Sequence, residues 1–203
     1  MNKAILTLLC FILTTILFGQ EIKISIAPTI NNAFYCQFVA GGPTFKSKLG
    51  LSTNIDFLLH SNNRLNYGVG INFQSSSVEI IPEPNLPPND RPRHTEKISI
   101  FSFYLNTVYN FKNGLYMSLA PSLDLHTNYE SIINNIYQTI DNQTGLGLTY
   151  GFGKNLNLTN SLFLNIEPRL WIHNIIPFHD ENLPLRLTTI GLNFGLVFGH
   201  NVD

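Results

Sequence analysis

The side chains best suited to chemistry are a few charged and imidazole groups, in a chain of 203 residues of which 12% are charged. Glu167 and Arg169 are two residues apart in an alternating segment, so they share one face of a predicted strand. Asp56, Asp124 and His126 lie on the polar faces of other alternating segments. Buried charges need partners. We therefore expect these residues to form a structural polar cluster inside the protein, and the sharper alternative is a gate or a proton-linked site.

Ser122, Asp124 and His126 are the residue types of a nucleophile, an acid and a base, all within one segment. On a strand, residues two apart are separated by about 7 Å, which puts Ser122 and His126 roughly 14 Å apart. A nucleophile and its base must come within about 3 Å of each other. This strand cannot hold a triad alone, and we predict no catalytic residues. The alternative is a lipid-modifying enzyme that uses a second strand, for example through His173.

Other patterns exclude further kinds of chemistry. The glycines of "GLGLTYGFG" (145–153) alternate along a strand and do not open a helix, which argues against nucleotide binding. His94, His179 and His200 show no metal-ligand spacing, so we expect no metal and no cofactor. The formal net charge of −1 leaves no basic excess for nucleic acid.

The elements that must position these residues are strands. In "TTIGLNFGLVFG" (188–199), large apolar residues occupy every second position and small or polar residues lie between them, which indicates a β-strand. Seven further segments alternate in the same way, at 21–30, 48–60, 64–73, 99–111, 114–126, 144–153 and 161–173. Segments of about ten residues are long enough to cross a bilayer at a tilt.

The connections between these segments alternate between short and long. "SNN", "KNG" and "KNLNLTN" are short and rich in Asn or Gly, whereas 31–46, 78–96, 127–143 and 174–186 are long. Outer-membrane barrels have short periplasmic turns and longer external loops. We predict an all-β, eight-stranded antiparallel up-and-down transmembrane β-barrel, whose apolar face meets lipid and whose polar face lines a narrow lumen. A secreted soluble barrel or sandwich is the alternative.

The first residues have the layout of a secretory signal peptide. Lys3 supplies a positive start, residues 4–18 are almost continuously apolar, and Gly19 is a small residue before the expected cleavage site. We predict a signal peptide at 1–19 and one barrel domain at 20–203. Cys36 is then the single cysteine of the mature chain, so no internal disulfide is expected.

Three of the predicted loops have unusual compositions. The segment 78–96 contains five prolines, which favours a mobile external loop or a docking arm. Residues 129–141 place isoleucines at helical intervals and predict a short amphipathic helix over the barrel mouth. Residues 31–42 are apolar for a loop, which suggests contact with lipid headgroups, another loop or a protein.

The chain resembles the family of small bacterial outer-membrane β-barrel domains, of the PorT-like or OmpA-like eight-stranded kind. The segments 108–125, 144–170 and 187–198 carry the resemblance through a strand–turn–strand, a Gly-rich strand followed by a strand with Glu and Arg, and a closing strand. The resemblance implies a bacterial outer-membrane location, contact with outer-membrane lipid, and assembly by the barrel insertion machinery. It carries no catalytic residues across.

These observations together predict a non-enzymatic outer-membrane protein with a structural or an adhesion and assembly role, which acts through its external loops and a possible protein partner there. Two alternatives stay open. One is an eight-stranded barrel enzyme that modifies outer-membrane lipid, and the other is a narrow channel, which the small lumen of eight strands disfavours.

Overall fold

The computed structural model describes residues 20–35, 44–60, 64–81, 93–129, 140–178 and 185–199. Its strands are β1 (Gln20–Tyr35), β2 (Thr44–Ser47), β3 (Leu49–His60), β4 (Leu65–Ile81), β5 (His94–Asn110), β6 (Leu115–His126), β7 (Gly145–Thr159), β8 (Leu162–Pro177) and β9 (Leu185–Phe198). β2 and β3 both pair with β4, and Lys48 separates them at a one-residue change of register. They are two parts of one interrupted strand.

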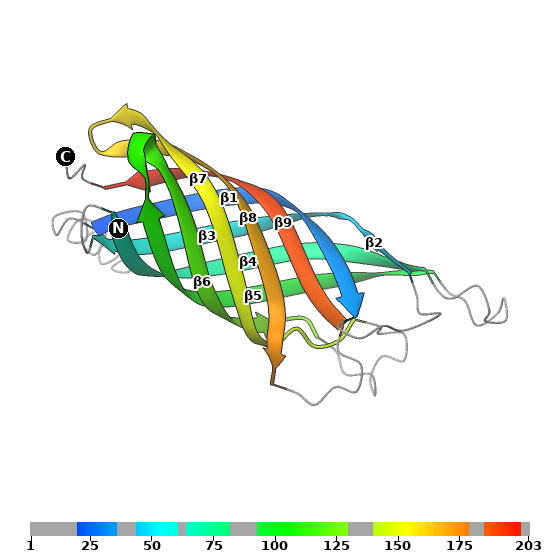
Figure 1. The fold of residues 1–203 in the computed structure, drawn as a ribbon. Coiled ribbons are helices and arrows are strands. Elements are labelled where there is room, and N and C mark those ends of the chain that lie inside the picture. Colours follow the sequence, from blue (N-terminus) through cyan, green and yellow to red (C-terminus); the bar gives the residue numbers. More distant parts are fainter. Residues whose placement is uncertain are drawn as a thin grey trace, which may run out of the picture.

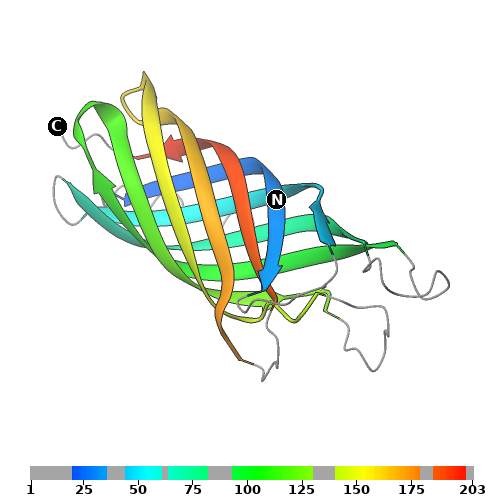
Figure 2. The ribbon, with the colours of Figure 1, turned by 45° about the vertical axis from the view of Figure 1, so that its right-hand side comes forward.

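The sheet closes on itself, as both ribbon views show (Figure 1, Figure 2). When β2 and β3 are counted as one strand, each strand pairs antiparallel with its neighbours in sequence, and β9 returns to β1 with Ile22 opposite Phe198. With β2 and β3 taken as one strand, the described residues form an eight-stranded antiparallel up-and-down barrel. The predicted fold class is confirmed.

β1 begins and β9 ends at the same end of the barrel, because Ile22 pairs with Phe198. The tight turn Lys112–Gly114 (η2) between β5 and β6 lies at this end, which we call the turn end. Asn113 and Gly114 have φ angles of 64° and 72°, the left-handed conformation that an Asn-Gly turn adopts readily. The opposite end, where β4 meets β5 and β8 leads to β9, is called the loop end.

The strands are longer than predicted. β4 and β5 have 17 residues each and pair up to Ile80 and His94, so both ends of the proline-rich segment belong to the sheet. β1 continues through part of the apolar segment 31–42, where Ala33 pairs with Leu187. The predicted turn 154–160 is strand as far as Thr159. The predicted strand ends were wrong because the backbone continues to pair with the neighbouring strand after the alternation of apolar residues stops.

Large apolar side chains point outward and polar side chains point inward. Leu49, Leu105 and Ile190 are 78%, 63% and 62% exposed on the outer surface. Asn54 and Asn193 point inward and are at most 1% exposed, and Asn54 Nδ2 donates a hydrogen bond to Asn193 Oδ1 at 2.9 Å. A soluble barrel has the opposite arrangement, with its apolar side chains inside.

The two ends of the lumen are apolar. At the loop end one buried cluster is formed by Ala33, Val78, Ile80, Ile98, Ile100, Ile140 and Leu187, with Phe45 packed against it. At the turn end a smaller cluster consists of Leu58, Val108 and Tyr116. The buried carboxylates Asp56, Asp124 and Glu167 lie between these two layers.

Several predictions concern residues outside the described part of the chain: the signal peptide 1–19, Cys36, the prolines within 82–92, His179, His200, and residues 130–139 of the expected amphipathic helix. In the described part, no helix is long and apolar enough to cross a membrane.

Candidate functional site

The middle of the lumen contains a fully buried group of two cations and two anions, which we call the charged cluster: Lys23, Asp56, Glu167 and Arg169. Lys23 Nζ forms an ion pair with Glu167 Oε2. Arg169 donates from Nη2 to Glu167 Oε2 at 2.8 Å and from Nε to Oε1 at 3.2 Å. Its Nη2 also lies 3.7 Å from Asp56 Oδ2. All four residues are at most 4% exposed, and their formal charges cancel.

Neutral polar groups complete the coordination of the charged cluster. Ser118 Oγ donates to Glu167 Oε1 at 2.9 Å, and Lys23 Nζ donates to the Tyr116 hydroxyl at 2.9 Å. Asn106 Nδ2 donates to Asp56 Oδ1 at 3.0 Å. Buried charges are tolerated when they are paired and hydrogen-bonded in this way.

The cluster also ties opposite walls of the barrel together. Arg169 on β8 donates from Nη1 to Asn54 Oδ1 on β3 at 3.3 Å and to the Tyr104 hydroxyl on β5 at 3.4 Å. Neither β3 nor β5 is paired with β8. Gly151 leaves the space that this requires, since a Cβ there would lie 1.9 Å from Glu167 Oε1.

A second group, nearer the loop end, has the order of an acid, an imidazole and a hydroxyl. Asp124 Oδ2 lies 2.9 Å from His173 Nδ1, and His173 Nε2 lies 3.4 Å from Thr189 Oγ1. Thr189 Oγ1 donates to Asn31 Oδ1 at 2.8 Å and accepts from Gln74 Nε2 at 2.7 Å.

This order of groups does not make a nucleophile. The Thr189 hydroxyl lies closer to the Asn31 oxygen, at 2.8 Å, than to His173 Nε2, at 3.4 Å, so its proton is directed away from the imidazole. Asp124, His173 and Thr189 are at most 1% exposed. A reacting group would have to reach the hydroxyl through the wall or through the packed lumen.

The sequence-predicted polar residues therefore lie in two places. Asp56, Glu167 and Arg169 come together in the charged cluster, whereas Asp124 pairs with His173. His126 lies apart from both at the end of β6, where its Nδ1 accepts a hydrogen bond from the Gln143 backbone at 3.3 Å. The sequence predicts one cluster, whereas the structure divides these residues between two groups at different heights along the barrel.

Two members of these groups were missed from the sequence. Lys23 lies between Ile22 and Ile24, so the alternation already placed it on the inward face, and that was the signal available. Thr189 gave no comparable signal, because it is one of several hydroxyl residues on inward faces. Among the described residues, no group of three or more His, Cys, Asp or Glu could hold a metal ion. His94, one of the scattered histidines, lies 2.9 Å from Glu96.

A recess of about 10 Å³ opens at the turn end beside Lys23, Asn106, Tyr116 and Asn155. This volume holds about one water molecule. Beyond it the lumen is filled by the charged cluster and its partners.

A closed barrel with an apolar exterior and a packed polar lumen defines the class: the chain has the fold of the small eight-stranded outer-membrane β-barrel proteins. No protein-family model matches the sequence, and no curated protein is similar to it.

Solved structures of outer-membrane proteins have folds similar to that of this chain. The outer membrane protein OprG from Pseudomonas aeruginosa is 13% identical over 90% of this chain and 97% of its own, with a TM-score of 0.54. The outer membrane protein AlkL, determined in lipid bilayers, is 11% identical over 91% and 92%, with a TM-score of 0.51. Neisserial surface protein A is 14% identical over 89% and 97%, with a TM-score of 0.50. The resemblance predicted from the sequence is confirmed at the level of the fold.

Proposed function

We propose that this chain is a non-enzymatic protein of the bacterial outer membrane, in which a plugged barrel anchors external segments for a structural or an adhesion and assembly role. The turn end faces the periplasm and the loop end faces outward. Export uses a signal peptide cleaved after residue 19, and the barrel insertion machinery places the barrel in the membrane. The observation that carries this proposal is an apolar exterior around a lumen closed by cross-wall polar contacts.

The exterior supports a membrane location. A backbone in hydrocarbon must have all its N–H and C=O groups paired, and a closed barrel achieves this without any free strand edge. The outward side chains are large and apolar along all eight strands, for example Val69 on β4 and Phe194 on β9, at 53% and 43% exposed. Such a surface is compatible with lipid and would aggregate in water.

The lumen supports a plug rather than a channel. Gln74 on β4 donates to Thr189 on β9 at 2.7 Å, although these strands are not neighbours in the sheet. Together with the contacts of Arg169 to β3 and β5, it spans the interior at two heights. Ions would have to break these bonds and pass the apolar cluster at the loop end.

The buried histidine argues against a lipid-modifying enzyme. An enzyme of this kind needs its nucleophile and base where a lipid ester can reach them. His173 and Thr189 face the lumen and are at most 1% exposed. A partner protein would instead meet the loop end, where Ile175, Ile176 and Phe178 are 45%, 57% and 54% exposed.

The test uses the purified full-length mature chain refolded into neutral phospholipid vesicles. We expect unheated and boiled samples to migrate differently on a detergent gel, no stable conductance steps in planar bilayers, and no lipid hydrolysis or acyl transfer. Recovery of the native chain as a soluble periplasmic protein would reject the membrane location. Unitary conductance steps would favour the channel. Lipid turnover that disappears in His173→Gln would favour the enzyme.

A further inference from the structure

The outer surface of the loop end carries three lysines on either side of the last part of β4, which we call the lysine patch: Lys46 on β2, Lys48 directly after it, and Lys97 on β5. Lys46 on β2 is paired opposite Glu79 on β4. Lys48 Nζ lies 3.8 Å from Glu79 Oε2 and donates to Thr95 Oγ1 on β5 at 3.3 Å. Lys97, two residues along β5, is exposed on the same face. Three exposed lysines therefore lie close together on this face, with the Lys48 ammonium group beside the one carboxylate.

The lysine patch is on one side of the barrel only, as far as the described residues go. Arg93, just before β5, is exposed beside it. The remaining exposed cations, Arg64, Lys112 and Lys154, lie at the turn end, and Lys23, Arg169 and Arg186 point inward. At the loop end, no exposed Lys or Arg is described on β6 to β9. The exposed cations of the loop end are therefore concentrated on β2, at Lys48 and at the start of β5.

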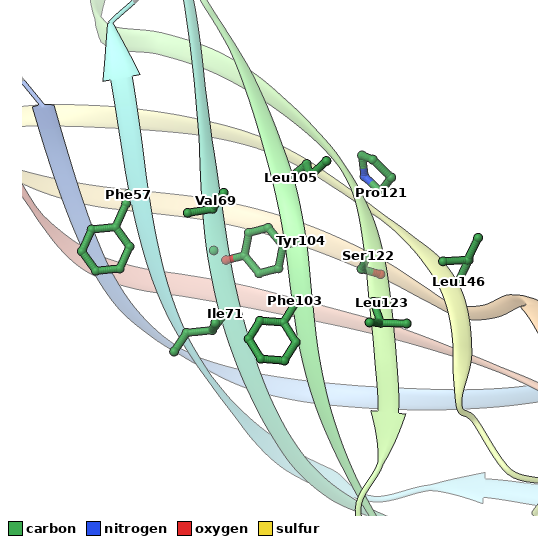
Figure 3. Close-up of a pocket in the computed structure, with 11 residues that line it drawn as sticks. Phe57, Val69, Ile71, Phe103, Tyr104, Leu105, Pro121, Ser122, Leu123 and Leu146 are labelled. Carbon is green, nitrogen blue, oxygen red and sulfur yellow. The ribbon is translucent and has the colours of Figure 1, made fainter. Parts of the chain in front are cut away.

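Directly below the lysine patch, the apolar exterior of the same strands is hollowed. A recess of about 350 Å³ is lined by Ile26, Ile55, Ile71, Phe73 and Phe101 among others. A second, of about 520 Å³, is lined by Phe57, Val69, Ile71, Phe103, Leu105 and Leu123 among others (Figure 3). Ile71 belongs to both, so the two recesses adjoin. Phe101 is four residues from Lys97 on β5, or about 13 Å along the strand.

The larger recess has a structural cause. The β5–β6 ladder is interrupted beside Pro121, since pairing stops at Tyr104 with Ser122 and resumes at Thr107 with Leu119. Proline has no N–H with which to continue the ladder. On the lumen side of the same place, Gly70 on β4 leaves room for the ring of Tyr104, because a Cβ at Gly70 would lie 2.3 Å from that ring. Figure 3 shows the Tyr104 ring beside β4, and Pro121 on β6, the strand on the other side of β5.

We propose that this side of the barrel is a binding site for a phosphorylated glycolipid of the outer leaflet. The lysine patch binds the phosphate groups, and the two recesses hold hydrocarbon chains. The site rests on the proposed function, because the recesses face lipid only if the barrel spans a membrane and the lysines meet outer-leaflet headgroups only if the loop end faces outward. The ligand must be amphiphilic, because the site has cations for an anionic headgroup and, about 13 Å further along the strand, apolar recesses for hydrocarbon chains.

Two properties follow from the chemistry of the lysine patch. Ammonium groups bind phosphate as point charges, so affinity must fall as ionic strength rises. A lysine near an anionic lipid surface contributes about fivefold in affinity, so loss of all three predicts a decrease of roughly 150-fold at low salt and less at physiological salt.

The first experiment measures binding of lipid A to the folded full-length mature chain in neutral detergent, by native mass spectrometry across a titration. The variant Lys46→Ala/Lys48→Ala/Lys97→Ala should lose at least thirtyfold in affinity. Its control, Arg64→Ala/Lys112→Ala/Lys154→Ala, removes the same charge at the turn end and should lose less than threefold. Dephosphorylated lipid A should bind the unchanged chain as weakly as lipid A binds the first variant. Equal losses in both triple variants, or undiminished binding of the dephosphorylated lipid, would overturn the headgroup site.

The second experiment tests the recesses. Val69→Trp fills the larger hollow, whereas Leu192→Trp adds the same bulk on β9, away from it. We expect Val69→Trp to weaken lipid A binding about tenfold and to leave binding of the phosphorylated disaccharide without chains unchanged. If both tryptophan variants bind lipid A like the unchanged chain, chain binding is wrong and adventitious anion binding is all that remains.

A gel-mobility assay of every variant in neutral vesicles distinguishes a failure of the proposed function from a failure of the lipid site. Failure of the unchanged chain to insert would reject the proposed function. Normal insertion with lipid A binding that ignores the lysines and the recess would reject the lipid site alone.

Discussion

Glu167→Gln is the most informative single change in the lumen, because it removes one charge and almost no volume. Glu167 accepts hydrogen bonds from Lys23, Arg169 and Ser118. In the variant, two buried cations would face Asp56 alone, and Arg169 Nη2 is 3.7 Å from that carboxylate. The charged cluster would pass from neutral to a net charge of plus one in a site that is 0% exposed at Glu167.

Removing one partner of a buried ion pair costs about 3–5 kcal/mol, because it leaves an uncompensated charge. This is a large part of the ~5–15 kcal/mol that stabilises a typical domain. We expect Glu167→Gln to lower the free energy of unfolding by about 5 kcal/mol, the upper end of the range for a broken buried ion pair, if both cations stay inside. Protein relaxation or entry of water through the recess beside Lys23 would bring the value toward the lower part.

The assay is urea unfolding in phospholipid vesicles, with gel mobility and tryptophan fluorescence as two readouts. The chain has one tryptophan. Trp171 is 1% exposed and its ring lies 5.9 Å from the Arg169 guanidinium carbon, so its emission reports directly on the cluster. Linear extrapolation of both transitions gives the free energy in water.

The double variant Lys23→Met/Glu167→Gln decides whether the cause is charge. It removes one charge of each sign and leaves Arg169 with Asp56, so the cluster is again neutral. We expect the double variant to be less destabilised than the sum of the two single variants, by roughly 1–3 kcal/mol. A Glu167→Gln change of less than about 0.5 kcal/mol, or strict additivity, would refute the reasoning that these charges are buried and coupled.

Three further predictions test the facing, processing and topology of the chain. Leu123→Arg, on the lipid side of β6, should cost roughly 2–4 kcal/mol in the same unfolding assay if it lies near the midplane, and a neutral result would mean the opposite facing. Mass spectrometry of the mature protein should start near Gln20, and a retained Met1 would contradict cleavage. A membrane-impermeant maleimide should label Cys36 on intact cells, with Cys36→Ser as control; labelling that requires an opened outer membrane would place Cys36 in the periplasm.

The direction of each side chain could be predicted from the sequence, because a strand has a period of two and each face meets one environment. Phe103 and Ser102, or Leu123 and Ser122, are assigned to the correct faces by alternation alone. Closure and strand number also followed, since the short and long connections alternate around an even number of strands. The contacts inside the lumen depend on the height of each residue along the barrel as well as on the side to which its side chain points.

Height along the barrel could not be predicted, because it depends on register and on the stagger between strands. Asp124 and Glu167 both point inward, yet Asp124 is paired opposite Ser102 and Glu167 opposite Asn193. Their neighbours therefore differ, and one expected cluster becomes two. The contacts of Arg169 with β3 and β5 cross the lumen, and no local sequence pattern encodes them.

Polarity changes sides along β4 and β5, and this change indicates where the membrane boundary meets these two strands. On β5 the outward residues change from Lys97 and Ser99 to Phe101 and Phe103, while the inward ones change from isoleucine to serine and asparagine. On β4 the outward change falls between Phe73 and Ser75. Phe73 is paired opposite Phe101, and Ser75 opposite Ser99, so both strands change at the same height.

Two solvents explain this inversion. Above the boundary, outward polar groups and an inward apolar cluster form the arrangement of a protein in water, which buries its hydrophobic side chains. Below it, the outer solvent is hydrocarbon and the polar side chains must satisfy one another inside. A single soluble environment would give one polarity along the whole strand. On β4 and β5 the loop end is therefore a water-facing extension of the lipid-facing barrel, and the lysine patch lies at their junction.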